Sequence, residues 1–363
     1  MITLTDVTKH YEGATTPAVE NLSLTIEEGT ITVLVGPSGC GKTTTLKMIN
    51  RLIEPTSGDI TVGGNSVIDR PPHELRREIG YVIQHIGLFP HKTIRKNIAT
   101  VPHLLGWDAA RIAERVDELI ELVDLDEEML DRYPHELSGG QRQRVGVARA
   151  LAADPPVMLM DEPFGAVDPI VRGKLQDELL DLQRRVKKTI VLVTHDVDEA
   201  VKLGDKVAIL NIGGVLEQYD SPEVILGSPA NDFVRSFLGT DRGLKRLGLF
   251  PIETLQLDTG PFVGVGATTA VARSVAQSHN SEWIGVLAED DTLLGWSPVD
   301  SLAVDGVVTE AAERFLSWVD CNDSLRDALE VIISSHTRIA AVLDGGTFKG
   351  IVTLDQIYAE IMT

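Results

Sequence analysis

The sequence contains little cysteine, no long apolar run and no secretory pattern at its start. Cys40 and Cys321 are its two cysteines and lie far apart, so no disulfide framework is indicated, and a reducing cytoplasm is the expected compartment. No stretch reaches roughly 18 uninterrupted apolar residues, and residues 1–6 lack the basic and apolar pattern of a signal peptide. We therefore expect a chain that does not cross a membrane by itself.

Basic residues are scarce relative to acidic ones. The 363 residues include 33 Lys and Arg against 54 Asp and Glu, which leaves a formal net charge of -21. Such a surface repels nucleic acid and anionic lipid, so we expect no nucleic-acid partner, and any bound phosphate needs a local site. At roughly 150 residues per domain the length predicts about two domains. The composition is that of an ordinary globular protein.

Short apolar runs alternate with helical patterns over about the first 230 residues, which is typical of an α/β domain built on a largely parallel sheet. Continuous apolar runs at residues 31–35, 157–160 and 189–194 predict strands that are covered on both faces. Between about residues 86 and 151 the pattern is helical, with little that indicates a strand. This segment is therefore predicted to be a helical insertion in the α/β domain.

A polar, glycine-containing joint at residues 239–246 predicts a domain boundary, which divides the chain into residues 1–240 and 241–363. The second segment contains a weak repeat of a helical stretch followed by two short strands, which predicts two similar modules packed together. We expect its tryptophans to fill the cores of these modules. The copies match at a constant offset of 55, which pairs residues 284–289 with 339–344, Gly295 with Gly350 and Asp300 with Asp355.

A glycine-rich stretch directly follows the first predicted strand. Residues 36–43 fit the pattern GxxxxGK[ST], and a helical pattern follows them. The glycines let backbone N–H groups wrap around a phosphate, and the positive N-terminal end of the helix adds to the attraction. Lys42 would reach the β and γ phosphates, and the Thr43 hydroxyl would bind Mg²⁺. The alternative, a chance glycine-rich turn, is disfavoured by the strand and helix on either side.

Two carboxylates, Asp161 and Glu162, end the apolar run at residues 157–160. Paired acids at the end of a buried strand need a reason, because burying a charge is costly. Beside a phosphate loop, Asp161 would hold Mg²⁺ and Glu162 could accept a proton from an attacking water. His195 follows the third strand and could position that water. A solvated strand end and a structural histidine stay open as alternatives on these residues alone.

A second candidate anion site lies within the helical insertion. Ser138, Gly139, Gly140 and Gln141 precede a helical stretch, and such a helix start can bind an anion. An ordinary Ser-capped helix is the alternative, although a cap requires neither two glycines nor a glutamine. One chain thus has two anion-binding helix starts but one catalytic carboxylate pair. A second copy, placed head to tail with two-fold symmetry, would complete the sites.

Taken together, these residues resemble the ATP-binding cassette (ABC) ATPases over about residues 1–235, with Leu137 to Gln141 matching the family signature. The resemblance implies a P-loop ATPase fold, ATP and Mg²⁺ as cofactors, and a homodimer that sandwiches two ATP molecules between each phosphate loop and the other subunit's signature. By position, it implies ATP contacts from Tyr11, Gly36, Pro37, Ser38, Gly39, Cys40, Gly41, Lys42, Thr43, Thr44, Ser138, Gly139, Gly140, Gln141 and Asp168. It implies metal contacts from Thr43, Gln84 and Asp161, and catalytic roles for Lys42, Gln84, Glu162 and His195.

More narrowly, residues 84–91, the acidic helical insertion and residues 241–246 resemble the importer ATPases for glycine betaine, carnitine, choline and proline. The resemblance implies a subunit at the cytoplasmic face of the plasma membrane that hydrolyses ATP to import a compatible solute. Its partners would be two transmembrane permease subunits, with an extracytoplasmic solute-binding protein acting indirectly. The apolar residues expected to receive the permease are Ile86, Leu88, Phe89 and Pro90.

In those importers the tail is a pair of cystathionine-β-synthase (CBS) modules, and this tail departs from their nucleotide-binding pattern. Residues 350–353 fit GxxT, but Gln356 stands where an aspartate is usual, and Pro298 and Ser301 stand at the matching positions of the first copy. These departures weaken the case for ribose-type nucleotide binding. A nucleotide regulator and a purely structural tail stay open as alternatives. A third is a response to ionic strength, in which salt would screen Arg242, Lys245 and Arg246.

Other functions also stay open on the sequence. A soluble ABC ATPase acting on ribosomes or DNA would need no membrane partner, but such proteins usually carry two cassettes or long coiled-coil insertions. The net charge of -21 also disfavours polyanions. A nucleotide sensor without turnover is disfavoured by Glu162 and His195. An importer ATPase for a different small solute would retain the same ATPase chemistry.

Overall fold

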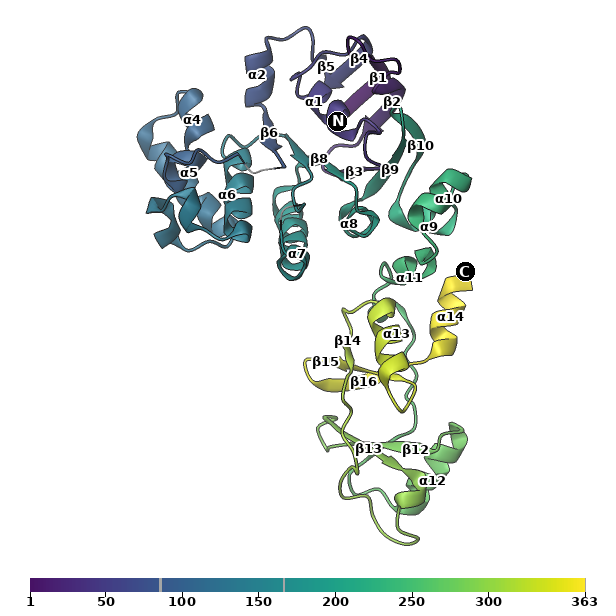
Figure 1. Ribbon diagram of the computed structural model, residues 1–363. Coiled ribbons are helices and arrows are strands. Elements are labelled where there is room, and N and C mark those ends of the chain that lie inside the picture. Colours follow the sequence, from purple (N-terminus) through teal and green to yellow (C-terminus); the bar gives the residue numbers. More distant parts are fainter. Residues whose placement is uncertain (85–86, 166, 363) are drawn as a thin grey trace. The chain divides into compact units, whose positions relative to one another are not determined.

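The computed structural model describes residues 1–84, 87–165 and 167–362, and the chain forms two compact units, Met1–Gly239 and Thr240–Thr363. The N-terminal unit contains a six-stranded and a four-stranded sheet with helices around them (Figure 1). The C-terminal unit contains two three-stranded sheets. Among the described residues, no helix combines the length and apolar character needed to span a bilayer.

The larger sheet of the N-terminal unit contains the strands predicted from the continuous apolar runs. Its strands are β3 (Ile31–Val35), β6 (Ile79–Val82), β7 (Val157–Asp161), β8 (Thr189–Thr194), β9 (Lys206–Asn211) and β10 (Val215–Asp220). Their order is β10-β9-β3-β8-β7-β6, and all neighbours pair in parallel except β9 and β10. Every residue of β3, β7 and β8 is buried, as expected for strands covered on both faces.

The smaller sheet of the N-terminal unit is antiparallel and has the order β2-β1-β4-β5. Its strands are β1 (Ile2–Lys9), β2 (Val19–Ile26), β4 (Ser57–Val62) and β5 (Asn65–Ser66). Helix α1 (Lys42–Ile49) packs against β4 and against β7 and β8. The side chains of Leu46, Met48 and Ile49 are fully buried there. The helix that follows the glycine-rich loop is therefore held between the two sheets.

Helices fill the rest of the N-terminal unit. They are α2 (Pro72–Arg77), α3 (Ile94–Ile98), α4 (Thr100–Leu104), α5 (Ala109–Leu122), α6 (Gly139–Leu151), α7 (Pro169–Val186), α8 (Val197–Leu203), α9 (Pro222–Gly227) and α10 (Asp232–Leu238). The described residues from 87 to 151 contain α3 to α6, two short 3-10 turns at Glu127–Asp131 and Pro134–Glu136, and no strand. Helix α5 begins at Asp108, whose side chain accepts a hydrogen bond from the Arg111 N–H, and it buries an apolar stripe.

The C-terminal unit consists of two similar halves, as the repeat predicts. In each half a parallel and an antiparallel strand pair form a sheet, in the orders β11-β12-β13 and β14-β15-β16. The strands are β11 (Phe262–Gly264), β12 (Trp283–Leu287), β13 (Leu293–Pro298), β14 (Val319–Asp320), β15 (Ala340–Asp344) and β16 (Thr347–Val352). The helices are α11 (Arg242–Leu247), α12 (Thr269–Ser278), α13 (Leu325–Ser334) and α14 (Leu354–Met362), with 3-10 turns at Ile252–Thr254 and Val299–Ser301.

Most of the polar joint is helical, and α11 packs against α13 and α14 and buries Leu247 as part of the C-terminal unit. One expectation for this part of the chain, that its tryptophans fill the cores, was wrong for Trp318. Trp318 does not fill a core, since 54% of its surface is exposed. Trp283 does pack among aromatic rings, with Phe262 and Phe315 close by. The residues around Trp318 show no periodicity that would indicate an outward-pointing side chain.

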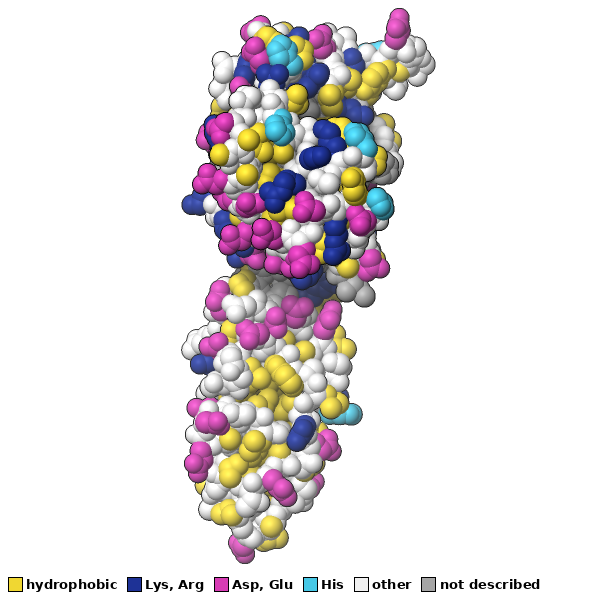
Figure 2. Space-filling view, turned by 90° about the vertical axis from the view of Figure 1, so that its left-hand side faces the viewer, with side chains coloured by type: hydrophobic (Ala, Val, Ile, Leu, Met, Phe, Trp, Pro, Cys, Tyr) yellow, Lys and Arg dark blue, Asp and Glu magenta, His cyan; other side chains and the backbone are white. Residues whose placement is uncertain are grey.

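The two units present different surfaces. On the face shown in Figure 2, acidic and basic side chains are interspersed over the N-terminal unit, whereas apolar side chains gather on the C-terminal unit. Exposed apolar residues of the C-terminal unit include Val304 and Leu316, the latter 90% exposed.

The repeat also explains one pair of glycines and generates a prediction. Gly295 and Gly350 have φ of 152° and 150°, and a Cβ at Gly295 would overlap the carbonyl oxygen of Glu313.

Gly295→Ala should therefore destabilise the C-terminal unit by about 1–3 kcal/mol, which calorimetry of the full chain would measure as a lower unfolding temperature. Gly264→Ala is the matched control, because its Cβ meets no atom within 4 Å. Equal stability of the two variants would contradict the close approach.

Candidate functional site

Three neighbouring strands carry the predicted site residues to one edge of the larger sheet. Strand β8 pairs in parallel with β3 on one side and β7 on the other. The carboxyl ends of the three strands therefore meet at the same edge, where sites on parallel sheets usually lie. The loop at residues 36–41 follows β3, Asp161 and Glu162 end β7, and His195 follows β8. Residues far apart in the sequence are brought together in this way.

The glycine-rich loop is shaped by close backbone contacts. Gly36 and Gly41 have φ of 159° and 90°, and a Cβ at either position would overlap a neighbouring carbonyl oxygen. No side chain caps the first turn of α1, so the N–H groups of that turn point to the loop without a side-chain acceptor. The Lys42 ammonium donates to the carbonyl oxygens of Gly36 at 2.7 Å and Pro37 at 3.1 Å. This arrangement forms a positively charged, donor-rich cradle.

Thr43 and Asp161 form the link between the loop and the neighbouring strand. The Thr43 hydroxyl donates to the Asp161 carboxylate at 2.9 Å. Asp161 is 8% exposed, and burial raises its pKa, with the neighbouring charge of Glu162 adding to the rise and the Thr43 hydrogen bond opposing it. A hydroxyl and a carboxylate oxygen are the donor types that Mg²⁺ prefers. The pair fits a magnesium ion bound next to a phosphate.

Two side chains converge on the carboxylate of Glu162. The Gln84 amide donates to one oxygen at 2.9 Å, and the Nδ1 of His195 lies 3.4 Å from the other. The Glu162 backbone adopts φ of 45°, and its N–H donates to the Val193 carbonyl oxygen. A cavity of about 40 Å³ lies beside Glu162 and His195, which is room for a water molecule. The carboxylate is thus held at both oxygens next to a space that water can occupy.

The other predicted residues lie elsewhere in the unit. Ser138 caps α6 by accepting from the Gln141 N–H at 3.3 Å, and the Gln141 side chain accepts from the Ser138 N–H at 2.9 Å. Figure 1 shows α6 and α1 in different parts of the unit. Tyr11 is exposed, and the Lys9 ammonium lies 5.3 Å from its ring centre. Asp168 is exposed just before α7. The remaining loop residues, Ser38, Gly39, Cys40 and Thr44, lie with Lys42.

The structure adds supporting residues that the sequence analysis missed. Asp196 caps α8 through the N–H groups of Asp198 and Glu199. The buried Glu199 accepts from the Gln176 amide at 3.2 Å, and burial raises its pKa. This network fixes the start of α8 directly behind His195. The Asp-x-x-Glu spacing at 196–199, a helix-start pattern, could have indicated it.

Arg149 is a second missed residue. It donates from α6 to the carbonyl oxygen of Gly87 at 2.6 Å, and burial lowers its pKa. The stretch that follows Gln84 is thereby tied to the helix that begins at Ser138. Of the apolar residues expected there, Ile86 lies outside the described residues, Leu88 is half-buried, and Phe89 and Pro90 are exposed.

A separate cleft of about 840 Å³ lies in the C-terminal unit, with Arg273, Arg338 and Thr353 among its lining residues. The Gln356 side chain accepts from the N–H of Thr353 at 2.9 Å and from its hydroxyl at 3.1 Å. Its amide donates to the Gln256 carbonyl oxygen at 2.9 Å. Gln356 therefore caps the start of α14, and its side-chain oxygen already accepts two hydrogen bonds from Thr353.

Comparisons with known proteins agree with this arrangement. A family model described as ABC transporter matches residues 19–165. The osmoprotectant import ATP-binding protein OsmV of Salmonella typhimurium is 46% identical over 98% of this chain and 95% of its own length. The glycine betaine/carnitine/choline transport ATP-binding protein OpuCA of Bacillus subtilis is 44% identical over 99% of this chain and 97% of its own length.

Solved structures resemble the N-terminal part of the chain. The dimeric structure of a bacterial ABC transporter cassette has a TM-score of 0.55 and 35% identity, and covers 61% of this chain and 98% of its own. The same cassette in a post-hydrolysis state bound to ADP and phosphate has a TM-score of 0.55 and 34% identity, with the same coverage.

The burial of Asp161 generates a stability prediction. The pKa of Asp161 in the folded chain lies above its unfolded value, so the destabilisation that its charge contributes is absent below the unfolded pKa and grows as pH rises through the raised pKa. Asp161→Asn removes the buried charge, and the nucleotide-free variant should unfold at a higher temperature than the wild type near neutral pH. Thermal unfolding at about pH 4 should show a smaller difference. A variant that is equally less stable at both pH values would refute the assigned cause.

Proposed function

We infer that this chain, which belongs to the ABC transporter family, is an ATP-hydrolysing subunit that powers the import of an osmoprotectant. The observation that carries this inference is identity above 40% to importer ATP-binding proteins over almost the whole chain, the C-terminal unit included. Another relative, the carnitine transport ATP-binding protein OpuCA of Listeria monocytogenes, is 43% identical over 99% of this chain. The solute is proposed to be of the glycine betaine, choline, carnitine or proline type.

The proposed ATP site combines the loop, α1 and the end of β7. The loop N–H groups and Lys42 would bind the β and γ phosphates, and the Lys42 ammonium would exchange its two carbonyl acceptors for phosphate oxygens. Thr43 and Asp161 would hold Mg²⁺, and Gln84 would also contact the ion. When bound, the ion neutralises charge on the phosphates. Tyr11 would stack on the adenine ring.

Hydrolysis is proposed to depend on the held carboxylate. Glu162 would accept a proton from a water in the adjoining cavity as that water attacks the γ phosphate. Gln84 fixes one oxygen of Glu162, and His195, which is 62% exposed, can turn between Glu162 and the γ phosphate. The carboxylate is thereby oriented before the nucleotide arrives, which lowers the reorganisation that the reaction requires.

A second copy of the chain is proposed to complete each ATP site. Ser138, Gly139, Gly140 and Gln141 start α6 in the helical segment, where an exposed Ser138 and a helix start can receive a phosphate from another subunit. The solved cassette that this unit resembles is a dimer. With Asp168 beside α7 facing the partner, ATP would join two subunits and hydrolysis would release them.

The partners and the location are proposed from the same relatives. Two transmembrane permease subunits would bind at the exposed stretch that contains Phe89 and Pro90, on the cytoplasmic face of the plasma membrane. An extracytoplasmic solute-binding protein would deliver the solute to the permease. The alternatives, a soluble ABC ATPase without a membrane partner or an importer ATPase for an unrelated solute, are not favoured by the relatives.

The C-terminal unit is proposed to be a tandem CBS-type regulatory domain over residues 241–363, following an ATPase domain over residues 1–240 with a helical subdomain at about 86–151. The two matching halves and the cleft that contains Thr353 support this proposal. A nucleotide regulator would have to bind without Gln356 as a ribose acceptor, because its oxygen caps α14.

Glu162→Gln tests the ATPase mechanism. The amide cannot accept the proton, so phosphate release should fall by about 10²–10⁴-fold, while ATP binding persists and the ATP-bound dimer accumulates. Phosphate release and sedimentation in MgATP would measure the two effects. Glu20→Gln is the control, since Glu20 is exposed on β2. Near-wild-type turnover in Glu162→Gln would contradict the role of Glu162.

Solute uptake tests the transport function. The chain would be purified with its permease partners, reconstituted in vesicles, and supplied with ATP on its own side and labelled solute on the other. We expect uptake of at least one of glycine betaine, choline, carnitine and proline, and its loss in Lys42→Ala. Transport of a different solute alone would overturn the solute class, and failure to copurify with any permease would overturn the transport role.

A further inference from the structure

A cavity of about 470 Å³ lies between α5, α6 and α7 of the N-terminal unit. Its inner wall is apolar and includes the buried side chains of Met160, Phe164, Leu175 and Leu179. Met160 directly precedes Asp161, so one wall belongs to the strand end that carries the catalytic carboxylates. The proposed ATP, metal and catalytic residues do not themselves line this cavity. It is therefore a separate space that shares a wall with the ATPase site.

The cavity contains a buried hydrogen-bond donor without a partner. Gln143 on α6 lines it and is 3% exposed. Its amide nitrogen makes no hydrogen bond with the described residues. Leaving such a donor unpaired in a protein interior costs about 1–3 kcal/mol. Because Gln143 lines the cavity, a small turn of its side chain would bring this buried donor to an acceptor oxygen bound there.

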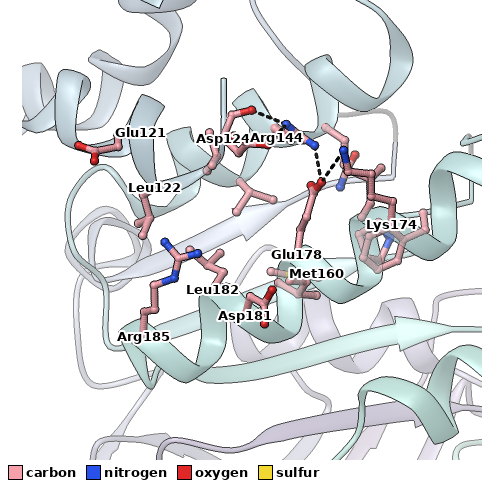
Figure 3. Close-up of a pocket in the computed structure, with 17 residues that line it drawn as sticks. Glu121, Leu122, Asp124, Arg144, Met160, Lys174, Glu178, Asp181, Leu182 and Arg185 are labelled. Carbon is pink, nitrogen blue, oxygen red and sulfur yellow. Dashed lines mark hydrogen bonds and ion pairs between the residues drawn. The ribbon is translucent and has the colours of Figure 1, made fainter. Parts of the chain in front are cut away.

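The charged side chains around the mouth are mostly paired with one another. Arg144 on α6 forms an ion pair with Glu178 on α7 and lies 3.4 Å from the Asp124 carboxylate. The Lys174 ammonium lies 3.9 Å from Glu178. These contacts are the dashed lines of Figure 3. Because these charged groups are paired with one another, they have little capacity left to bind a ligand.

Among the described lining residues, Arg185 is the cation without a partner at the mouth, and Glu121 is a carboxylate without one. No ion pair or hydrogen bond joins its guanidinium to the described part of the chain. Figure 3 shows it extending towards Leu122 and Leu182, whereas the Glu121 side chain points away from them. Its neighbour Arg184 is instead paired with Asp181 at 3.2 Å. The mouth therefore presents an unpaired cation above an apolar wall.

We propose that this cavity binds a small amphipathic anion, a carboxylate or sulfonate attached to a hydrocarbon or aromatic body. The anionic group meets Arg185, the body lies against Leu179 and Phe164, and an acceptor oxygen takes the Gln143 N–H. An apolar pocket with a few placed polar groups is typical of small-molecule sites. Because its walls belong to α6, which starts at Ser138, and to α7, a bound ligand holds these two helices at their present spacing.

The test uses the full chain without nucleotide and the probe 8-anilinonaphthalene-1-sulfonate, whose fluorescence reports binding. Arg185→Gln should raise the probe's Kd about tenfold or more, since a charge-assisted hydrogen bond is lost. Arg184→Gln is the comparison variant, because Arg184 does not line the cavity, and it should raise the Kd much less than Arg185→Gln; the small rise expected comes from its partner Asp181, a lining residue that loses its ion pair. This measurement does not depend on ATP turnover or transport.

Two further variants test whether the probe binds in this cavity. Leu179→Trp fills the apolar space and should abolish the saturable component. Gln143→Leu removes the unpaired donor without adding bulk, so it should weaken binding several-fold while the folded state becomes no less stable. Probe fluorescence that persists equally in both variants would place the binding elsewhere, for instance on the exposed apolar surface of the C-terminal unit, and would overturn the proposal.

Competition decides the charge of the ligand. Decanoate should displace the probe, and decyltrimethylammonium, with a hydrocarbon chain of the same length and the opposite charge, should not. Equal displacement by both compounds would show that apolar contact alone drives binding. Identical Kd values for Arg185→Gln and Arg184→Gln would also show that the Arg185 charge does not contribute to binding. Each of these two results would contradict an anion site.

Discussion

The hydrogen bond from Thr43 to Asp161 ties the glycine-rich loop to the end of the neighbouring strand, and the site depends on it. It places a buried carboxylate beside the first turn of α1 at a cost, because burial raises the pKa of Asp161. The packing around the site offsets the free-energy cost of burying this carboxylate. Helix α1 is held between two sheets, and β3, β7 and β8 are fully buried. The apolar runs that form the core therefore also fix the position of the nucleotide site.

Much of this site could be predicted from local sequence, because its parts are local. A continuous apolar run followed by Gly36 to Thr43 specifies a strand, a loop and a helix, and the Ser138 cap follows from its neighbours. The resemblance implied that Gln84, Glu162 and His195 share one site, but the contacts of Gln84 and His195 with the two Glu162 oxygens depend on strand order and could not be predicted from local sequence. The exposure of Trp318 depends on tertiary packing that no periodicity reports, and so does the unpaired amide of Gln143.

The N-terminal unit contains two helix starts that are proposed to bind phosphate, at α1 and at α6, and they lie in different parts of the unit (Figure 1). This separation is the reason for proposing a dimer, because each ATP molecule would contact α1 of one subunit and α6 of the other. Arg149 ties α6 to the segment after Gln84, where the permease is proposed to bind. Closure around ATP would therefore move the segment proposed to bind the permease, and it would also act on the helices α6 and α7 that line the cavity.

The most direct test of the shared site mixes two inactive chains, Lys42→Ala and Ser138→Arg, and measures ATP hydrolysis. Each variant alone forms dimers in which both sites are defective. A mixed dimer would combine the intact loop of one chain with the intact α6 start of the other, so one complete site would form. The account predicts that activity returns on mixing and is greatest near equal proportions. Activity no greater than the sum of the separate chains at every ratio would contradict it.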